Sequence, residues 1–134
     1  MKTFYISFFS IIFSMLIFDG LWLGMMIKRF YYPQLGHLMG DSLKPLPGLL
    51  FYILFAISLS LFVVLPALHN SSSYLSVLVM GMLFGLVTYG TYDLTNNATL
   101  KDWPAIVTVV DMAWGALLTG TVSIISTYIS RSFT

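Results

Sequence analysis

The chain has 134 residues, of which 58% are hydrophobic and only 8% charged, and its mean hydropathy is +0.91. An ordinary soluble domain is about half apolar and about a quarter charged, so this composition excludes a water-soluble fold. A net charge of +1 provides no basic surface for nucleic acid, and the absence of cysteine excludes disulfides, thiolate metal sites and cysteine nucleophiles.

Four apolar stretches are long enough to cross a bilayer, because a hydrocarbon core of about 30 Å needs roughly 20 helical residues. They cover about residues 4–27, 48–68, 74–94 and 105–128. The first stretch is too long for the apolar part of a signal peptide, and no small-x-small cleavage site follows it. We therefore predict an all-α fold: one integral membrane domain over residues 1–134, built as a four-transmembrane-helix bundle that passes through the membrane several times.

The segments between the spans contain residues that interrupt helices. Residues 28–47 hold prolines and glycines, residues 69–73 form a tight turn, and residues 95–104 end at a proline that suits the first turn of the last span. Four spans put both termini on one side, which we call face B. The loops 28–47 and 95–104 then lie on the opposite side, face A.

The two faces carry different numbers of basic residues. Face A carries Lys28, Arg29, Lys44 and Lys101, whereas face B carries Lys2 and Arg131. The positive-inside rule then predicts, by a narrow margin, that face A is cytoplasmic. Three aromatic residues, Tyr31, Tyr32 and Trp103, are expected in the interfacial belt of face A.

Pairs of small residues four positions apart occur in three of the spans. These pairs are Gly20 with Gly24, Gly81 with Gly85, and Ala116 with Gly120. Small residues at this spacing form a shallow groove on a helix, so they predict close approach of two helices in lipid.

Three aspartates, Asp19, Asp93 and Asp111, lie in the face-A half of the spans. An ionised aspartate at a helix centre costs roughly 2.5–3.5 kcal/mol on insertion scales, which offsets about five to ten apolar residues. No Lys, Arg or His lies inside a span to pair with them. Their partners are therefore expected to be a proton, a cation, hydrogen-bond donors, or a basic side chain that reaches down from the face-A loops.

Further polar and aromatic residues surround these aspartates. Trp22 and Trp114 each follow an aspartate by three residues, so each indole shares a helix face with that carboxylate and could hold one on a neighbouring helix. We predict one binding pocket that opens to face A, and its members are Asp19, Trp22, Tyr89, Tyr92, Asp93, Asn96, Asn97, Asp111 and Trp114. Its oxygen atoms suit a proton or a hard cation, and we expect neither a cofactor nor a dedicated metal centre.

The chain resembles a family of small bacterial inner-membrane proteins that is named only as a domain of unknown function. The resemblance rests on DGLWLG at residues 19–24, GLVTYGTYDLTN at residues 85–96, ATL with Trp103 at residues 98–103, and DMAWG at residues 111–115. It covers nearly the whole chain. It implies a four-span protein of the bacterial inner membrane, and it implies no activity.

A fainter likeness is to lipoprotein signal peptidase, another four-helix membrane protein. Its two catalytic aspartates lie where Asp93 and Asp111 lie here, and Asp19 also has a counterpart near the end of its first span. This likeness makes Asp93, Asp111 and Asp19 candidate catalytic residues. The asparagine- and arginine-bearing signatures around the peptidase aspartates are absent, the loop after span one is too short, and the charge count puts face A on the wrong side.

Three functions stay open at this point. The first is a small transport or binding module, acting as a homo-oligomer in the lipid bilayer, because four helices alone are too narrow for an internal pathway. The second is an aspartate-based membrane hydrolase or lipid-modifying enzyme, which requires Asp93 and Asp111 within hydrogen-bonding reach. The third is a structural accessory subunit.

Overall fold

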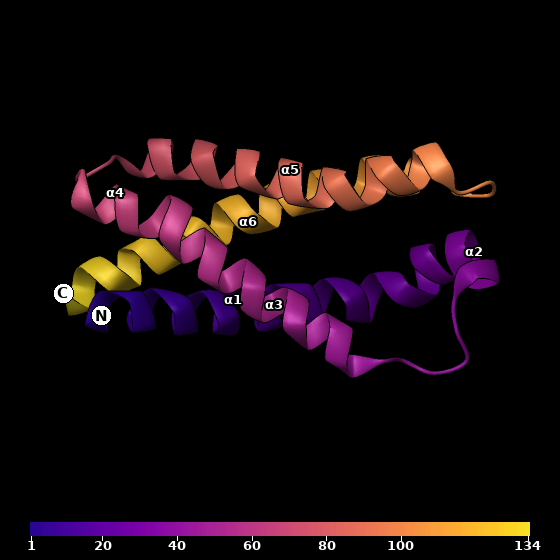
Figure 1. Ribbon diagram of the computed structural model, residues 1–134, viewed down its shortest axis with the longest axis horizontal. Helices are drawn as coiled ribbons and strands as arrows, with labels where there is room; N and C mark the ends of the chain where they lie inside the picture. Colours follow the sequence, from indigo (N-terminus) through magenta and orange to yellow (C-terminus); the bar gives the residue numbers. More distant parts are fainter.

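The computed structural model describes all residues from 1 to 134 and consists of helices without strands. Four helical segments are long and apolar enough to cross a membrane: Lys2–Leu38, Pro45–His69, Tyr74–Thr99 and Ala105–Phe133. Both termini lie at one end, face B, and the chain turns at the opposite end between α5 and α6 (Figure 1). The all-α, four-span prediction is confirmed.

The helical elements follow one another with few interruptions. They are α1 (Lys2–Met26), the π-helical turn η1 (Ile27–Tyr31), α2 (Tyr32–Leu35), the short 3-10 turn η2 (Gly36–Leu38), α3 (Pro45–Leu59), a second π-helical turn η3 (Ser60–Val64), α4 (Leu65–His69), α5 (Tyr74–Thr99) and α6 (Ala105–Phe133).

Two spans extend further toward face A than the sequence predicted. The first continues to Leu38 and the third to Thr99, so residues 28–38 and 95–99 are helical, not loop. In the third span, polarity does not end the helix because each hydroxyl finds a partner within it. Thr95 donates to the Thr91 carbonyl, and Thr99 donates to the Thr95 carbonyl at 2.8 Å.

Each of the two π-helical turns ends two residues before a proline. η1 ends before Pro33, and η3 ends before Pro66. A proline inside a helix clashes with the carbonyl four residues earlier, and in both cases that carbonyl lies in the wide turn. The π-helical turns therefore let the first and second spans continue past their prolines.

Helices α5 and α6 form the closest pair in the bundle, and glycine makes this approach possible. A Cβ atom at Gly85 would overlap the Gly115 carbonyl and lie 2.7 Å from Thr119 Oγ1, and one at Gly81 would lie 3.0 Å from Gly120 Cα. Two of the three predicted small-residue pairs thus pack as expected.

Gly20 and Gly24 behave differently from the other small-residue pairs. A Cβ atom at either position would meet no atom within 4 Å, and both residues are exposed. The pair does not pack inside the bundle, because the opposite face of α1 is the one that contacts α6 and α3.

The core of the bundle combines an apolar cluster with buried serines. Ile11, Met15 and Leu59 pack with residues of α6 on the apolar side. Toward face B, Ser7 Oγ and Ser60 Oγ lie 2.9 Å apart, linking the first and second spans. Apolar side chains and paired serines thus fill the interior of the bundle on the face-B side.

Candidate functional site

The carboxylate of Asp19 is buried and fully paired. Asp19 lies on α1, and it accepts hydrogen bonds from the Tyr52 hydroxyl of α3 and from Trp114 Nε1 of α6, the latter at 3.1 Å. Three helices therefore meet on this one side chain. The partner on α6 is the tryptophan that follows Asp111 by three residues.

The carboxylate of Asp111, on α6, is held by a tyrosine of the first span. The Tyr31 hydroxyl, at the end of η1, donates to Asp111 Oδ1 at 2.5 Å and accepts from Trp22 Nε1 at 3.0 Å. The wide turn η1 ends at Tyr31, and the Tyr31 hydroxyl there reaches Asp111 of α6. Trp114 thus donates directly to the aspartate of α1, whereas Trp22 donates to the tyrosine that holds the aspartate of α6.

Stacked indoles join these two carboxylates into one assembly. The Trp22 and Trp114 rings lie 4.3 Å apart with an interplanar angle of 6°. Tyr89 of α5, which packs against Gly115, lies within electrostatic range of both Asp19 and Asp111. The result is a polar layer in the face-A half of the bundle that every span contributes to.

The carboxyl group of Asp93 is the exception in this layer. It is completely buried, and neither of its oxygens has a hydrogen-bond donor. The Asp111 carboxyl group is close enough to act on it electrostatically. Two ionised carboxylates can only accept, so a hydrogen bond between them requires that one of them carries a proton.

The backbone carbonyl of Asp93 accepts a hydrogen bond, in contrast to its carboxyl group. Thr108 Oγ1 donates to the Asp93 carbonyl at 3.2 Å, and Trp103 Nε1 donates to Thr108 Oγ1 at 3.0 Å. Trp103 is itself buried, and its ring lies edge-on to Tyr92 at 5.7 Å. The indole of Trp103 therefore covers the face-A side of the Asp93 region.

The remaining predicted pocket residues lie at the edge of this layer, and Tyr92 is within electrostatic range of Asp93 and Asp111. Tyr92 is 57% exposed, Asn96 is half-buried and Asn97 is exposed, because α5 turns this edge away from α6. The four basic residues of face A, namely Lys28, Arg29, Lys44 and Lys101, are also exposed and do not reach into the layer.

The three aspartates lie in the same face-A half of the bundle. Nowhere do three His, Cys, Asp or Glu side chains come close enough to hold a metal ion together. Asp93 acts electrostatically on Asp111, and the stacked indoles join Asp111 to Asp19. The Asp19 carboxylate itself is held by Tyr52 of α3 and Trp114 of α6.

Sequence reasoning missed four residues of this site: Tyr31, Tyr52, Trp103 and Thr108. Tyr31 and Trp103 had been assigned to the interfacial belt, but both turn inward. A signal was available for Tyr52, the only tyrosine in the second span. Inward rotation of Tyr31 depends on the π-helical turn, which no local pattern announces.

Residues 4–128 match the family described as "Predicted membrane protein (DUF2177)", and the chain belongs to that family. No curated protein and no solved structure matches the chain significantly. The family establishes a membrane protein with multiple apolar helices, in agreement with the four spans.

Proposed function

We propose that this chain is a small transport or binding module of the bacterial inner membrane in which the Asp93–Asp111 pair takes up and releases a proton. One observation carries the proposal: the carboxyl group of Asp93 is fully buried without a hydrogen-bond donor, and another carboxyl group, that of Asp111, acts on it electrostatically. A charged group inside a membrane span is costly, and such residues commonly mark ion or proton sites.

A proton suits this pair better than a hard cation does. Two adjacent carboxylates repel each other when both are ionised, and one shared proton converts the repulsion into a hydrogen bond. Calcium requires about six to eight oxygen ligands, and magnesium requires near-octahedral coordination. No third acidic or imidazole ligand lies close enough to complete such a shell.

The Tyr31 hydroxyl gives the pair a connection toward face A. It is bonded to Asp111 and lies at the end of η1, the turn that also contains the basic residues Lys28 and Arg29. A hydroxyl that both donates and accepts can pass a proton by exchanging partners. We therefore assign exchange with the aqueous phase to Asp111 and Tyr31, and storage of the proton to Asp93.

Infrared spectroscopy of the carboxyl groups tests this proposal without knowledge of a substrate. The reconstituted protein should show the C=O band of a protonated, buried carboxylic acid, and both Asp93→Asn and Asp111→Asn should remove it. Asp102→Asn is the matched control, because Asp102 is an exposed carboxylate at the face-A turn. A spectrum in which the band is absent, or survives both replacements, contradicts the shared proton.

Transport across the membrane would further require a second copy of the chain, because the interior of one bundle is filled by packed side chains. We propose that two copies meet along the free Gly20–Gly24 face of α1. Gly20→Ile should then lower the dimeric fraction in cross-linking, whereas Val87→Ile on the exposed side of α5 should not. Equal cross-linking of both variants contradicts this contact.

An aspartate-based hydrolase is the second candidate, and the electrostatic contact between the buried Asp93 and Asp111 favours it. Such a pair can activate water when one carboxyl is protonated and the other ionised. A hydroxyl-bearing transition-state analogue of amide hydrolysis should then stabilise the wild-type protein and leave Asp93→Asn unaffected. Absence of any stabilisation would favour the proton module over the hydrolase.

A further inference from the structure

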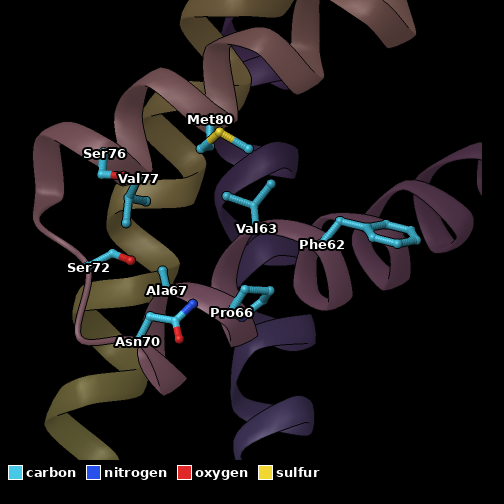
Figure 2. A pocket seen from close by; sticks show the side chains of 9 residues that line it. All are labelled: Phe62, Val63, Pro66, Ala67, Asn70, Ser72, Ser76, Val77 and Met80. Carbon is cyan, nitrogen blue, oxygen red and sulfur yellow. The ribbon is translucent and has the colours of Figure 1, made fainter.

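A groove on the face-B half of the molecule lies far from the aspartates. It runs between the end of the second span (η3 and α4) and the start of α5, and its volume is about 180 Å³ (Figure 2). Side chains from both elements point into it, with Val63 and Ala67 on one side and Val77 on the other.

The lining of the groove changes from polar to apolar along its length. Asn70, Ser72 and Ser76 lie at the face-B end, next to the turn that joins the two spans. Phe62 and Met80 lie at the opposite end, nearer the middle of the span, and the protein leaves 68% and 48% of their surfaces uncovered. The groove is therefore open sideways to the bilayer, with hydroxyl and amide groups at headgroup level and hydrocarbon below.

The face-B end of the groove carries positive charge without a compensating acid. The Arg131 guanidinium donates to the Ser72 carbonyl at 2.5 Å and lies 4.9 Å from the centre of the Tyr74 ring. All five acidic residues of the chain, Asp19, Asp41, Asp93, Asp102 and Asp111, lie in the face-A half. An anionic group near Ser72 would thus meet the Arg131 guanidinium and no acidic side chain.

We propose that this groove binds one anionic phospholipid, with its phosphate near Arg131 and one acyl chain between Val63 and Met80. Eight residues separate Asn70 from Phe62, which is about 12 Å along a helix. One leaflet contributes about half of a hydrocarbon core of about 30 Å, so the groove follows a chain through most of a leaflet. A transmembrane helix, with a diameter of about 10–12 Å, is too wide for this volume.

Lipid titration of the purified full-length protein by native mass spectrometry tests the charge part of the proposal. Wild-type protein should bind phosphatidylglycerol about fivefold more tightly than phosphatidylcholine, since one basic residue near a membrane surface contributes roughly that factor. Arg131→Gln should abolish this preference and Arg131→Lys should keep most of it. Lys2→Gln, which removes a charge at the same face away from the groove, should change nothing.

A second pair of variants tests the position of the lipid. Ser76→Phe places a ring in the polar end of the groove, where the exposed Ser76 side chain makes no hydrogen bond, and it should weaken binding of both lipids. Leu75→Phe, on a neighbouring exposed position outside the groove, should leave binding unchanged.

Three results would overturn the proposal. They are equal affinity of the wild type for the two lipids, equal loss of preference in Arg131→Gln and Lys2→Gln, and unchanged binding in Ser76→Phe. Circular dichroism of each variant separates loss of binding from loss of fold, and Arg131→Lys tests the charge even if Arg131→Gln does not fold.

Discussion

Removal of the Asp93 carboxyl group is expected to leave the fold intact or to stabilise it, which is unusual for a fully buried residue. No other residue donates to the carboxyl oxygens of Asp93, and the proposed stored proton leaves together with its side chain, so Asp93→Ala deprives no donor of its partner. An unpaired buried polar group costs about 1–3 kcal/mol. The free energy of unfolding of Asp93→Ala should therefore equal or exceed that of the wild type by up to about 3 kcal/mol.

Asp19→Ala is the matched variant, since it removes the same atoms from a carboxylate that is paired. It leaves the Tyr52 hydroxyl and Trp114 Nε1 without their acceptor. Each stranded donor costs about 1–3 kcal/mol, so the free energy of unfolding should fall by about 2–6 kcal/mol. Both variants replace a buried aspartate within a helix by alanine. The free energy of unfolding should nevertheless fall in Asp19→Ala and not fall in Asp93→Ala.

Unfolding by a denaturing detergent in mixed micelles, followed by circular dichroism, measures both values. Tryptophan fluorescence provides a second probe, because two of the three tryptophans form the stacked pair beside Asp19. If Asp93→Ala loses as much stability as Asp19→Ala, then Asp93 is a packing anchor, and the reasoning from its unpaired oxygens is wrong.

Three further predictions concern packing, the tyrosine link and orientation. Gly85→Ala should lower the free energy of unfolding by about 1–3 kcal/mol or more, because the new Cβ would overlap the Gly115 carbonyl. Gly24→Ala, with nothing within 4 Å, should be neutral or stabilising in the same detergent titration. Tyr31→Phe removes the donor to Asp111, so it should slow proton exchange of the pair in time-resolved infrared measurements while the Asp19 contacts, read by Trp114 fluorescence, stay intact. The chain has no cysteine, so single cysteines placed at Asn97 and Ser132 report sidedness directly. If face A is cytoplasmic, an impermeant thiol reagent added to whole cells should label the cysteine at position 132 and spare the one at position 97, and the reverse pattern refutes the orientation.

The number of spans could be predicted from the sequence because it depends only on length and polarity. Helix ends could not, since Thr95 and Thr99 satisfy their hydroxyls within α5 and extend the helix through a segment that reads as a loop. Glycine spacing predicted the α5–α6 contact correctly at Gly81 and Gly85. The same spacing at Gly20 and Gly24 produced no contact, because only the rotation of α1 decides which face meets a neighbour.

The candidate site could be predicted in its residue types but not in its pairings. Insertion cost alone singles out the three aspartates, whereas their partners depend on how each helix is rotated. Tyr52 faces Asp19 because the second span crosses the first at that level, and no pattern within the second span encodes this crossing. Trp103 looks like an interfacial residue until its hydrogen bond to Thr108 is seen.

The π-helical turn before Pro33 makes the position of Tyr31 a matter of helical register. A π-helical turn contains one residue more than an α-helical turn, so closing it would advance the following chain by one residue, about 1.5 Å and 100° around the axis. That rotation would carry the Tyr31 hydroxyl away from Asp111, and it would also return the Arg29 carbonyl to the position where it clashes with Pro33. Pro33 thus holds open the turn that keeps the Tyr31 hydroxyl on Asp111.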